Sequence, residues 1–316
     1  MSRRFKPSSL LRAAAKPYTR HSSEDASKGL RREGPKSVTR VFDILRDLVV
    51  QHSTSERAMV PVESKSELEV FYTGTASEIE SWVERHILSQ GTTRIGFDVE
   101  MRPAFRKGQK QNLPATIQLC VRESHEKFFA LVAHVHHVES FDDLRSFVRV
   151  FSDPLIRKAG VNVTGDSKML SSLFASRSTL DHCIKGLVDL APDSQLLAFQ
   201  KDELDYLANP RVKHFTMSQP PAGLKSILQR WCSLEPAFKT KRITLSNWEK
   251  SPLDELQIKY AAGDAWAGLF ASYEIEARKS HLVSEWQDIR QRYEKRVQEE
   301  KKYRKEINEL KKKNGG

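Results

Sequence analysis

The stretch RIGFDVEM, Arg94–Met101, places two acidic residues inside an apolar run that otherwise has the composition of a buried strand. Successive side chains of a strand face opposite sides of a sheet, so Asp98 and Glu100 share one face. Phe97 and Val99 occupy the other face. Neighbouring carboxylates repel each other, and burying an unpaired charge costs free energy. The stretch therefore predicts a positively charged partner over its acidic face.

The segments around this strand predict an α/β fold. Two β-rich runs, ATIQLCVR and EKFFALVA, follow it and are joined by the polar segment ESH, which predicts a hairpin. Strand-like and helix-like runs then alternate, and a long helical segment, PLDELQIKYAAGDAWAGLFASYEIEARK, comes after them. We expect a mixed sheet, antiparallel in its opening strands and then parallel, with helices on both faces.

The net charge of +11 is concentrated in two tails. The first 23 residues contain six Lys or Arg and no acid, and residues 295–316 contain nine Lys or Arg and four Glu. Residues 24–294 are formally neutral. Basic tails attract polyanions, of which nucleic acid is the most common. The alternative is a solvated targeting segment and a solvated helix.

We expect three parts along the 316 residues. Residues 1–62 are polar and predicted to be mostly disordered, with a short amphipathic helix at VTRVFDILRDLVV, Val38–Val50. The leading Arg- and Ser-rich stretch resembles a mitochondrial presequence, and a disordered basic arm is the alternative. Residues 63–282 form the predicted folded domain, and residues 283–316 form a basic helical tail.

Composition favours an intracellular protein of the nucleus, the cytoplasm or the mitochondrion. The three cysteines, Cys120, Cys183 and Cys232, are far apart and odd in number. This pattern is typical of a reducing compartment and argues against a disulfide scaffold or a zinc finger. No run of about 18 apolar residues occurs, so we expect no segment that spans a membrane.

Further acidic residues stand at positions where local structure can be predicted. In YAAGDAWAG, Tyr260 and Asp264 are four residues apart and share one face of a helix. In VNVTGDSKML, Asp166 follows a strand and stands at the start of a helix. Each has a plain alternative: a helix N-cap for Asp166, and a solvated or hydrogen-bonded helix face for Tyr260 and Asp264. For Asp98 and Glu100 the alternative is an exposed pair on an edge strand. Asp189, in GLVDLA, is interpreted as structural.

The acids become informative in combination. Two stand on the first core strand, one follows a later strand and one lies on the long helix, so all four can converge on one cluster: Asp98, Glu100, Asp166 and Asp264. No Cys or His is grouped with them. An all-oxygen site suits Mg²⁺ or Mn²⁺ rather than zinc. The simplest positive partner for the acidic strand is therefore a pair of divalent metal ions.

The order of three motifs, FDVE, NVTGD and YAAGD, resembles that of the DEDD superfamily, the ribonuclease D and Werner-type 3′-to-5′ exonucleases. The connecting segments ATIQLCVRES, KAGVNVTGD and LSNWEKSPLDELQIKYAAGDAWAG are similar as well, and the resemblance covers about residues 64–278. Tyr260 stands four residues before Asp264, and Lys259 stands where the histidine subclass carries His. The chain therefore resembles the tyrosine subclass, DEDDy, which implies a ribonuclease H-like exonuclease fold.

The resemblance also implies roles for the motif residues. The four acids would hold two Mg²⁺ or Mn²⁺ ions, and Tyr260 would position or help activate the attacking water. The implied reaction is hydrolysis of the terminal phosphodiester at the 3′ end of a nucleic acid, releasing nucleoside 5′-monophosphates. Trp248, in SNW, is interpreted as mainly structural. Lys168 departs from the Werner-type pattern, which has tryptophan there, although a lysine can still contact a phosphate.

A basic loop, RPAFRKGQKQ, follows the acidic strand and is the predicted phosphate-binding segment. A plain solvated loop is the alternative. Its positive side chains are Arg102, Arg106, Lys107 and Lys110. A catalytically silent nucleic-acid-binding or scaffold protein on the same fold is the alternative function, which loss of a motif acid would indicate. The sequence does not distinguish DNA from RNA as the substrate.

Overall fold

The computed structural model describes residues 37–51, 59–60, 62, 65–105, 111–180, 183–208 and 223–314. The presequence-like segment predicted within the first 36 residues lies outside this part of the chain. None of the helices within the described ranges combines the length and the apolar character needed to cross a bilayer.

A seven-stranded sheet forms the centre of the described chain, in the order β1-β3-β6-β5-β4-β7-β8. Neighbours pair antiparallel in β1–β3, β4–β5 and β5–β6, and parallel in β3–β6, β4–β7 and β7–β8. This topology confirms the predicted mixed sheet and the predicted hairpin. The strands are β1 (Val38–Asp43), β3 (Glu67–Thr73), β4 (Arg94–Glu100), β5 (Thr116–Arg122), β6 (Lys127–Ala133), β7 (Arg157–Gly160) and β8 (Leu187–Asp189); β2 (Val49–Gln51) pairs separately with β9 (Leu234–Pro236).

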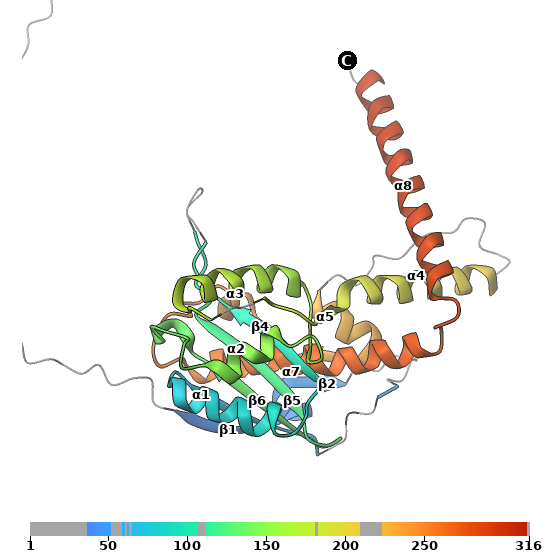
Figure 1. The fold of residues 1–316 in the computed structure, drawn as a ribbon. Helices are drawn as coiled ribbons and strands as arrows, with labels where there is room; N and C mark the ends of the chain where they lie inside the picture. Colours follow the sequence, from blue (N-terminus) through green and yellow to red (C-terminus); the bar gives the residue numbers. More distant parts are fainter. Residues whose placement is uncertain are drawn as a thin grey trace, which may run out of the picture. The chain divides into compact units, whose positions relative to one another are not determined.

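Helices cover both faces of the sheet, and each face has its own apolar core. One face packs against α1 (Ala76–Val83), α2 (Arg145–Ser152) and α3 (Val163–Arg177), while α7 (Glu255–Ser280) crosses the other (Figure 1). The remaining helices are α4 (Leu190–Ala208), α5 (Leu224–Ile227), α6 (Lys241–Thr244) and α8 (Trp286–Asn314). Single turns at Ile44–Leu48, Glu84–Leu88, Val135–His137 and Leu228–Cys232 complete the described elements.

Helix α7 begins at a capping box and lies unusually close to the sheet. The backbone N–H of Gln257 donates to the Asp254 side chain at 2.9 Å, and the Gln257 side chain accepts from the Asp254 N–H at 3.2 Å. Further along, a Cβ atom at Gly96 of β4 would collide with the backbone carbonyl of Ala265. Glycine at this position therefore lets the α7 backbone rest directly on β4.

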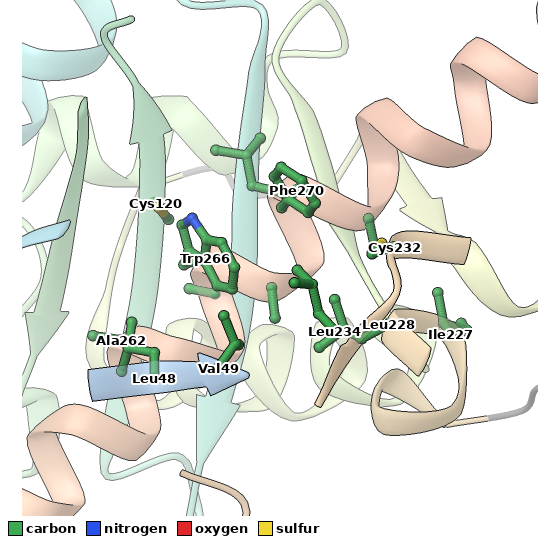
Figure 2. Close-up of a cluster of buried hydrophobic side chains, with 14 of the residues drawn as sticks. Leu48, Val49, Cys120, Ile227, Leu228, Cys232, Leu234, Ala262, Trp266 and Phe270 are labelled. Carbon is green, nitrogen blue, oxygen red and sulfur yellow. The ribbon is translucent and has the colours of Figure 1, made fainter. Parts of the chain in front are cut away.

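The outer side of α7 is covered by the smaller elements. Figure 2 shows Trp266 and Phe270 of α7, with Cys120 of β5 on one side of them and Leu228 and Leu234 on the other. All five side chains are buried. Because α7 is apolar on two sides, it is held in place between the sheet and this second layer.

The helix predicted over Val38–Val50 is wrong. Residues 38–43 form β1, a single turn spans Ile44–Leu48, and β2 follows. Strand β1 pairs antiparallel with β3 at the edge of the sheet, so long-range backbone pairing overrides a helix-like apolar spacing. The β-branched residues of VTRV suit this strand. The folded domain therefore begins by Val38, not at residue 63.

Candidate active site

The two acids of the opening motif lie at the carboxyl end of β4. Ile95, Phe97 and Val99 point into the core under α1–α3, so Asp98 and Glu100 point to the opposite face, which α7 covers. Both side chains are half-buried. The prediction that the two carboxylates share one face of a sheet strand is therefore seen directly in the register of β4.

Helix α7 brings a third carboxylate to the first two. Oxygen atoms of Asp98, Glu100 and Asp264 all lie within 4.8 Å of one another. Burial, then the charges of Asp264 and Asp166, raises the pKa of Asp98 well above its usual range. Burial, then the charges of Asp98 and Asp264, does the same to the pKa of Glu100. The three carboxylates repel one another, and a bound cation would relieve this repulsion.

Asp166 lies in the first turn of α3 and approaches the cluster from another side. Burial, followed by the charge of Asp189, raises its pKa to about 7. It contributes to the raised pKa of Asp98, but its oxygens lie outside the group of three described above. Asp189 itself accepts backbone N–H bonds from Asn162 at 3.2 Å and Ala191 at 3.1 Å, which gives it a structural position.

Lys239 is a cation of the site that the sequence reasoning missed. Its Nζ atom lies 2.8 Å from both carboxylate oxygens of Asp264 and 5.3 Å from the centre of the Tyr260 ring. Burial lowers the pKa of Lys239, but the charges of Asp264, Tyr260 and Asp98 together raise it above its usual value. The lysine therefore remains charged. The sequence shows only that Lys239 follows Phe238, so its contact with Asp264 came from the structure.

A family profile described as 3′-5′ exonuclease matches residues 71–278. The match covers the three acids of the cluster, Asp166, Tyr260 and Lys239. The chain belongs to this 3′-5′ exonuclease family. The predicted family is thereby confirmed.

Curated relatives carry the same description. A 3′-5′ exonuclease of Arabidopsis thaliana is 28% identical over 205 residues, which are 63% of this chain and 60% of that protein. The mouse bifunctional 3′-5′ exonuclease/ATP-dependent helicase WRN is 31% identical over 182 residues, 58% of this chain and 11% of that protein. The chain thus spans less than two thirds of the length of each. A solved structure of Trypanosoma brucei RNase D with GMP matches at 18% identity and a TM-score of 0.49, over 69% of this chain and 62% of that one.

In this member of the family the motif tyrosine is buried beside the acids. The Thr244 hydroxyl donates to the Tyr260 hydroxyl at 3.1 Å, and the rings of Phe238 and Trp248 lie 6.1 and 5.9 Å from that of Tyr260. Burial, then the Asp264 charge, raises the pKa of Tyr260 above its usual value. The phenol therefore stays protonated at neutral pH and can donate a hydrogen bond. Trp248 is fully buried, as a structural residue should be.

Two polar residues of β5 were also missed. Gln118 stands opposite Asp98 and Thr116 stands opposite Glu100 in the sheet register. Both are fully buried, and the Gln118 amide nitrogen donates to the Thr116 hydroxyl at 2.5 Å. The run ATIQLCV carried the signal, because its two polar residues alternate with apolar ones and so share the acidic face.

The predicted substrate-binding residues are only partly described. Arg102 follows β4 and pairs with Glu249 at 3.1 Å. Lys168 is exposed on α3, two residues past Asp166, and no described side chain pairs with its ammonium group. Arg106, Lys107 and Lys110 lie outside the described residues.

The donor set of the cluster fits a hard divalent cation. Its ligand atoms are carboxylate oxygens alone. The Asp264 Oδ1 atom is buried, and the Lys239 Nζ atom lies 2.8 Å from it.

Proposed function

We propose that the chain is a 3′-to-5′ exonuclease that hydrolyses the terminal phosphodiester bond of a nucleic acid and releases nucleoside 5′-monophosphates. The observation that carries this proposal is the convergence of Asp98 and Glu100 of β4 with Asp264 of α7 within 4.8 Å. The residues belong to segments far apart in the sequence, and family membership supports the same activity.

The acids of the site would hold the metal. Asp98, Glu100 and Asp264 would supply most ligands, and Asp166 would complete the site from α3. Two Mg²⁺ or Mn²⁺ ions bound there would lower the pKa of an attacking water and stabilise the departing 3′ oxygen. Binding would also relieve the repulsion that raises the pKa values of Asp98 and Glu100.

The residues around the acids act by orientation and charge. Tyr260, kept protonated by burial and by Asp264, would donate a hydrogen bond that orients the attacking water; it would not act as a base at neutral pH. Lys239 supplies a positive charge beside Asp264 and would favour the negative charge that develops on the phosphate. Both side chains are held in place by the packing around α7.

The substrate would be bound through its phosphates. Arg102, Arg106, Lys107 and Lys110 follow the acidic strand, and Lys168 stands two residues after Asp166, so all five would contact the substrate near its 3′ end. The basic tails would add affinity that is independent of sequence and decreases with salt.

The test is a digestion of matched DNA and RNA oligonucleotides, single-stranded and duplex, each labelled at the 5′ end. With Mg²⁺ or Mn²⁺ present, we expect a ladder of products shortened from the 3′ end and released nucleoside 5′-monophosphates. EDTA should abolish both. Full-length chain that leaves every substrate intact, in a preparation whose fold is verified by circular dichroism, would contradict the proposal. The relative rates give the preference for DNA or RNA.

A further inference from the structure

The opposite end of β4 borders a second site of different chemistry. A hollow of about 610 Å³ opens between the turn before β4, the β5–β6 hairpin and the second half of α7. Four arginines from four different segments line it: Arg85, Arg94, Arg122 and Arg157. The volume lies within the range of small-molecule sites, roughly 300–1,000 Å³.

Two of these arginines form a fixed wall. Arg94 and Arg157 both pair with Glu276 of α7, and the Arg94 guanidinium lies 4.8 Å above the centre of the Tyr273 ring. The Arg94 side chain is only 10% exposed. Its orientation is therefore set by α7, and it presents a rigid, partly shielded positive group to the hollow.

The other two arginines have no carboxylate partner among the described residues. The Arg122 Nε atom donates to the Ser124 carbonyl at 3.0 Å, and its Nη2 atom lies 2.5 Å from the His125 Nδ1 atom. The Arg122 guanidinium lies 5.2 Å from the centre of the Tyr273 ring. Tyr273 is thus contacted by two guanidinium groups, from Arg94 and Arg122. Arg85 is exposed. These two groups keep donors that no described acid occupies.

The balance of charge favours an anion. Of the acids, Glu123 lines the hollow and pairs with Lys127 at 3.5 Å, while Glu276 of α7 pairs with Arg94 and Arg157. Polar side chains of the turn before β4, among them Gln90 and Thr92, line the same hollow. Guanidinium groups bind phosphate through paired hydrogen bonds, which makes several convergent arginines typical of phosphate recognition.

We propose that this hollow, the arginine pocket, binds the phosphate group of a nucleotide. It is separate from the acid cluster, because Arg94 and Asp98 lie four residues apart on one strand, about 13 Å at the rise of a β-strand. Without a divalent metal the acid cluster repels phosphate, so anion binding to metal-free protein that is lost when the pocket arginines are replaced is a property of the pocket. The inference does not depend on nuclease activity.

Isothermal titration calorimetry of the full chain in EDTA tests the proposal, with AMP as the probe. Inorganic phosphate and adenosine show whether the phosphate is the recognised group. The pocket variant is Arg85→Gln with Arg122→Gln, which leaves the pair with Glu276 intact. Its matched control, Arg145→Gln with Arg149→Gln, removes two exposed arginines of α2 that do not line the pocket. Arg85→Gln alone serves if the double variant melts early.

We expect saturable binding of AMP and phosphate, little binding of adenosine, and at least a tenfold loss of AMP affinity in the pocket variant, about 1.4 kcal/mol. The control should stay within about twofold. A 5′-phosphorylated oligonucleotide that displaces AMP would identify a nucleic-acid strand as the source of the phosphate. An oligonucleotide that does not displace AMP would identify a free nucleotide as the source. Either result supports the site. The proposal is overturned by absence of saturable binding, by unchanged affinity in the pocket variant, or by equal losses in both variants.

Discussion

The two ends of β4 show how one backbone arrangement supports opposite chemistry. Arg94, Gly96, Asp98 and Glu100 alternate along the strand and all face α7. At the carboxyl end, three carboxylates gather around one lysine. At the amino end, four arginines line one hollow, and two of them pair with Glu276. Between them Gly96 lets the α7 backbone touch the strand, so the helix fixes both groups. The packing of α7 on β4 fixes where the two groups of charged side chains lie, and the residue types at each end decide whether the group is negative or positive.

The largest expected effect comes from a substitution at the acidic end of β4, which should reduce nuclease activity without changing AMP binding at the other end. Asp98→Asn removes a metal-ligating charge with little change in volume, so nuclease activity should fall by about 10³-fold or more, since metal ions supply several kcal/mol of transition-state stabilisation. Binding of AMP at the arginine pocket should be unchanged. Rates on a 5′-labelled oligonucleotide and calorimetry in EDTA provide the two measurements.

Asp205→Asn is the matched control, because Asp205 is exposed on α4. Full activity of the Asp98→Asn protein would rule out Asp98 as a ligand. In the absence of metal the same variant should melt a few degrees higher, since one repulsive charge is removed; a stabilisation of 1 kcal/mol corresponds to about 2–4 °C in a domain of this size.

Tyr260→Phe tests whether the acidic end works by orientation as well as by charge. Loss of the hydroxyl should reduce turnover by about 10²–10⁴-fold while oligonucleotide binding is retained, as expected of a group that positions water. Tyr293→Phe is a matched control, since its hydroxyl contacts Gln195 of α4, away from the acids. Single-turnover rates at saturating substrate provide the measurement, and equal rates for the two variants would reduce Tyr260 to a packing residue.

The sequence predicted the acid cluster at the carboxyl end of β4 better than it predicted the rest of the molecule. Period-two spacing placed Asp98 and Glu100 on one face, and helical spacing placed Tyr260 and Asp264 together, because both relations are local. That the strand meets the helix was inferred from the combination of the four acids and from the resemblance of three motifs. Lys239 was missed because its contact with Asp264 depends on how the segment after β9 folds back onto α7.

Strand β1, at the edge of the sheet, also depends on a contact between distant segments that the sequence did not predict. Residues 38–50 have apolar residues at helical spacing, but β1 is stabilised by pairing with β3, a partner distant in sequence. The arginine pocket is equally non-local, because its four arginines come from four segments. Local periodicity therefore predicted elements and faces, while contacts between distant segments required the structure.

Lys239→Met would remove the positive charge from the acidic end of β4 and so increase the difference in charge between its two ends. It removes the cation that pairs with Asp264, so the metal-free protein should lose about 1.5–3 kcal/mol of stability, the usual contribution of a hydrogen bond to a charged group. Added Mn²⁺ should then raise the melting temperature by more than in the wild type, since no lysine competes for Asp264.

Lys185→Met is the control for a surface lysine, because Lys185 is exposed. Thermal melts with and without Mn²⁺ provide the measurement. An identical Mn²⁺ shift in the Lys239→Met and wild-type proteins would show that the lysine and the metal do not share Asp264.

The smallest effect concerns the tails, which carry positive charge outside both ends of β4. A protein trimmed to residues 37–294 keeps β1 and the buried start of α8, Trp286 and Ile289. It should retain turnover at saturating oligonucleotide. Its log affinity for a single strand should depend less steeply on log salt, by about 0.7 for each phosphate that the tails neutralise in the full-length protein. Equal slopes for full-length and trimmed proteins would show that the tails do not contact nucleic acid.

The place of α7 in the chain has a consequence for synthesis. Its residues follow every strand of the sheet, so a nascent chain can complete β1–β6 long before α7 leaves the ribosome. At about 5–20 residues per second, the face that α7 will cover waits roughly 6–25 s. During that interval Phe128 and Cys120 remain exposed to water and to other chains, and Asp264 has not yet joined the acids of β4. Between the completion of β6 and the arrival of α7, this apolar surface is the part of the sheet most open to non-native contacts.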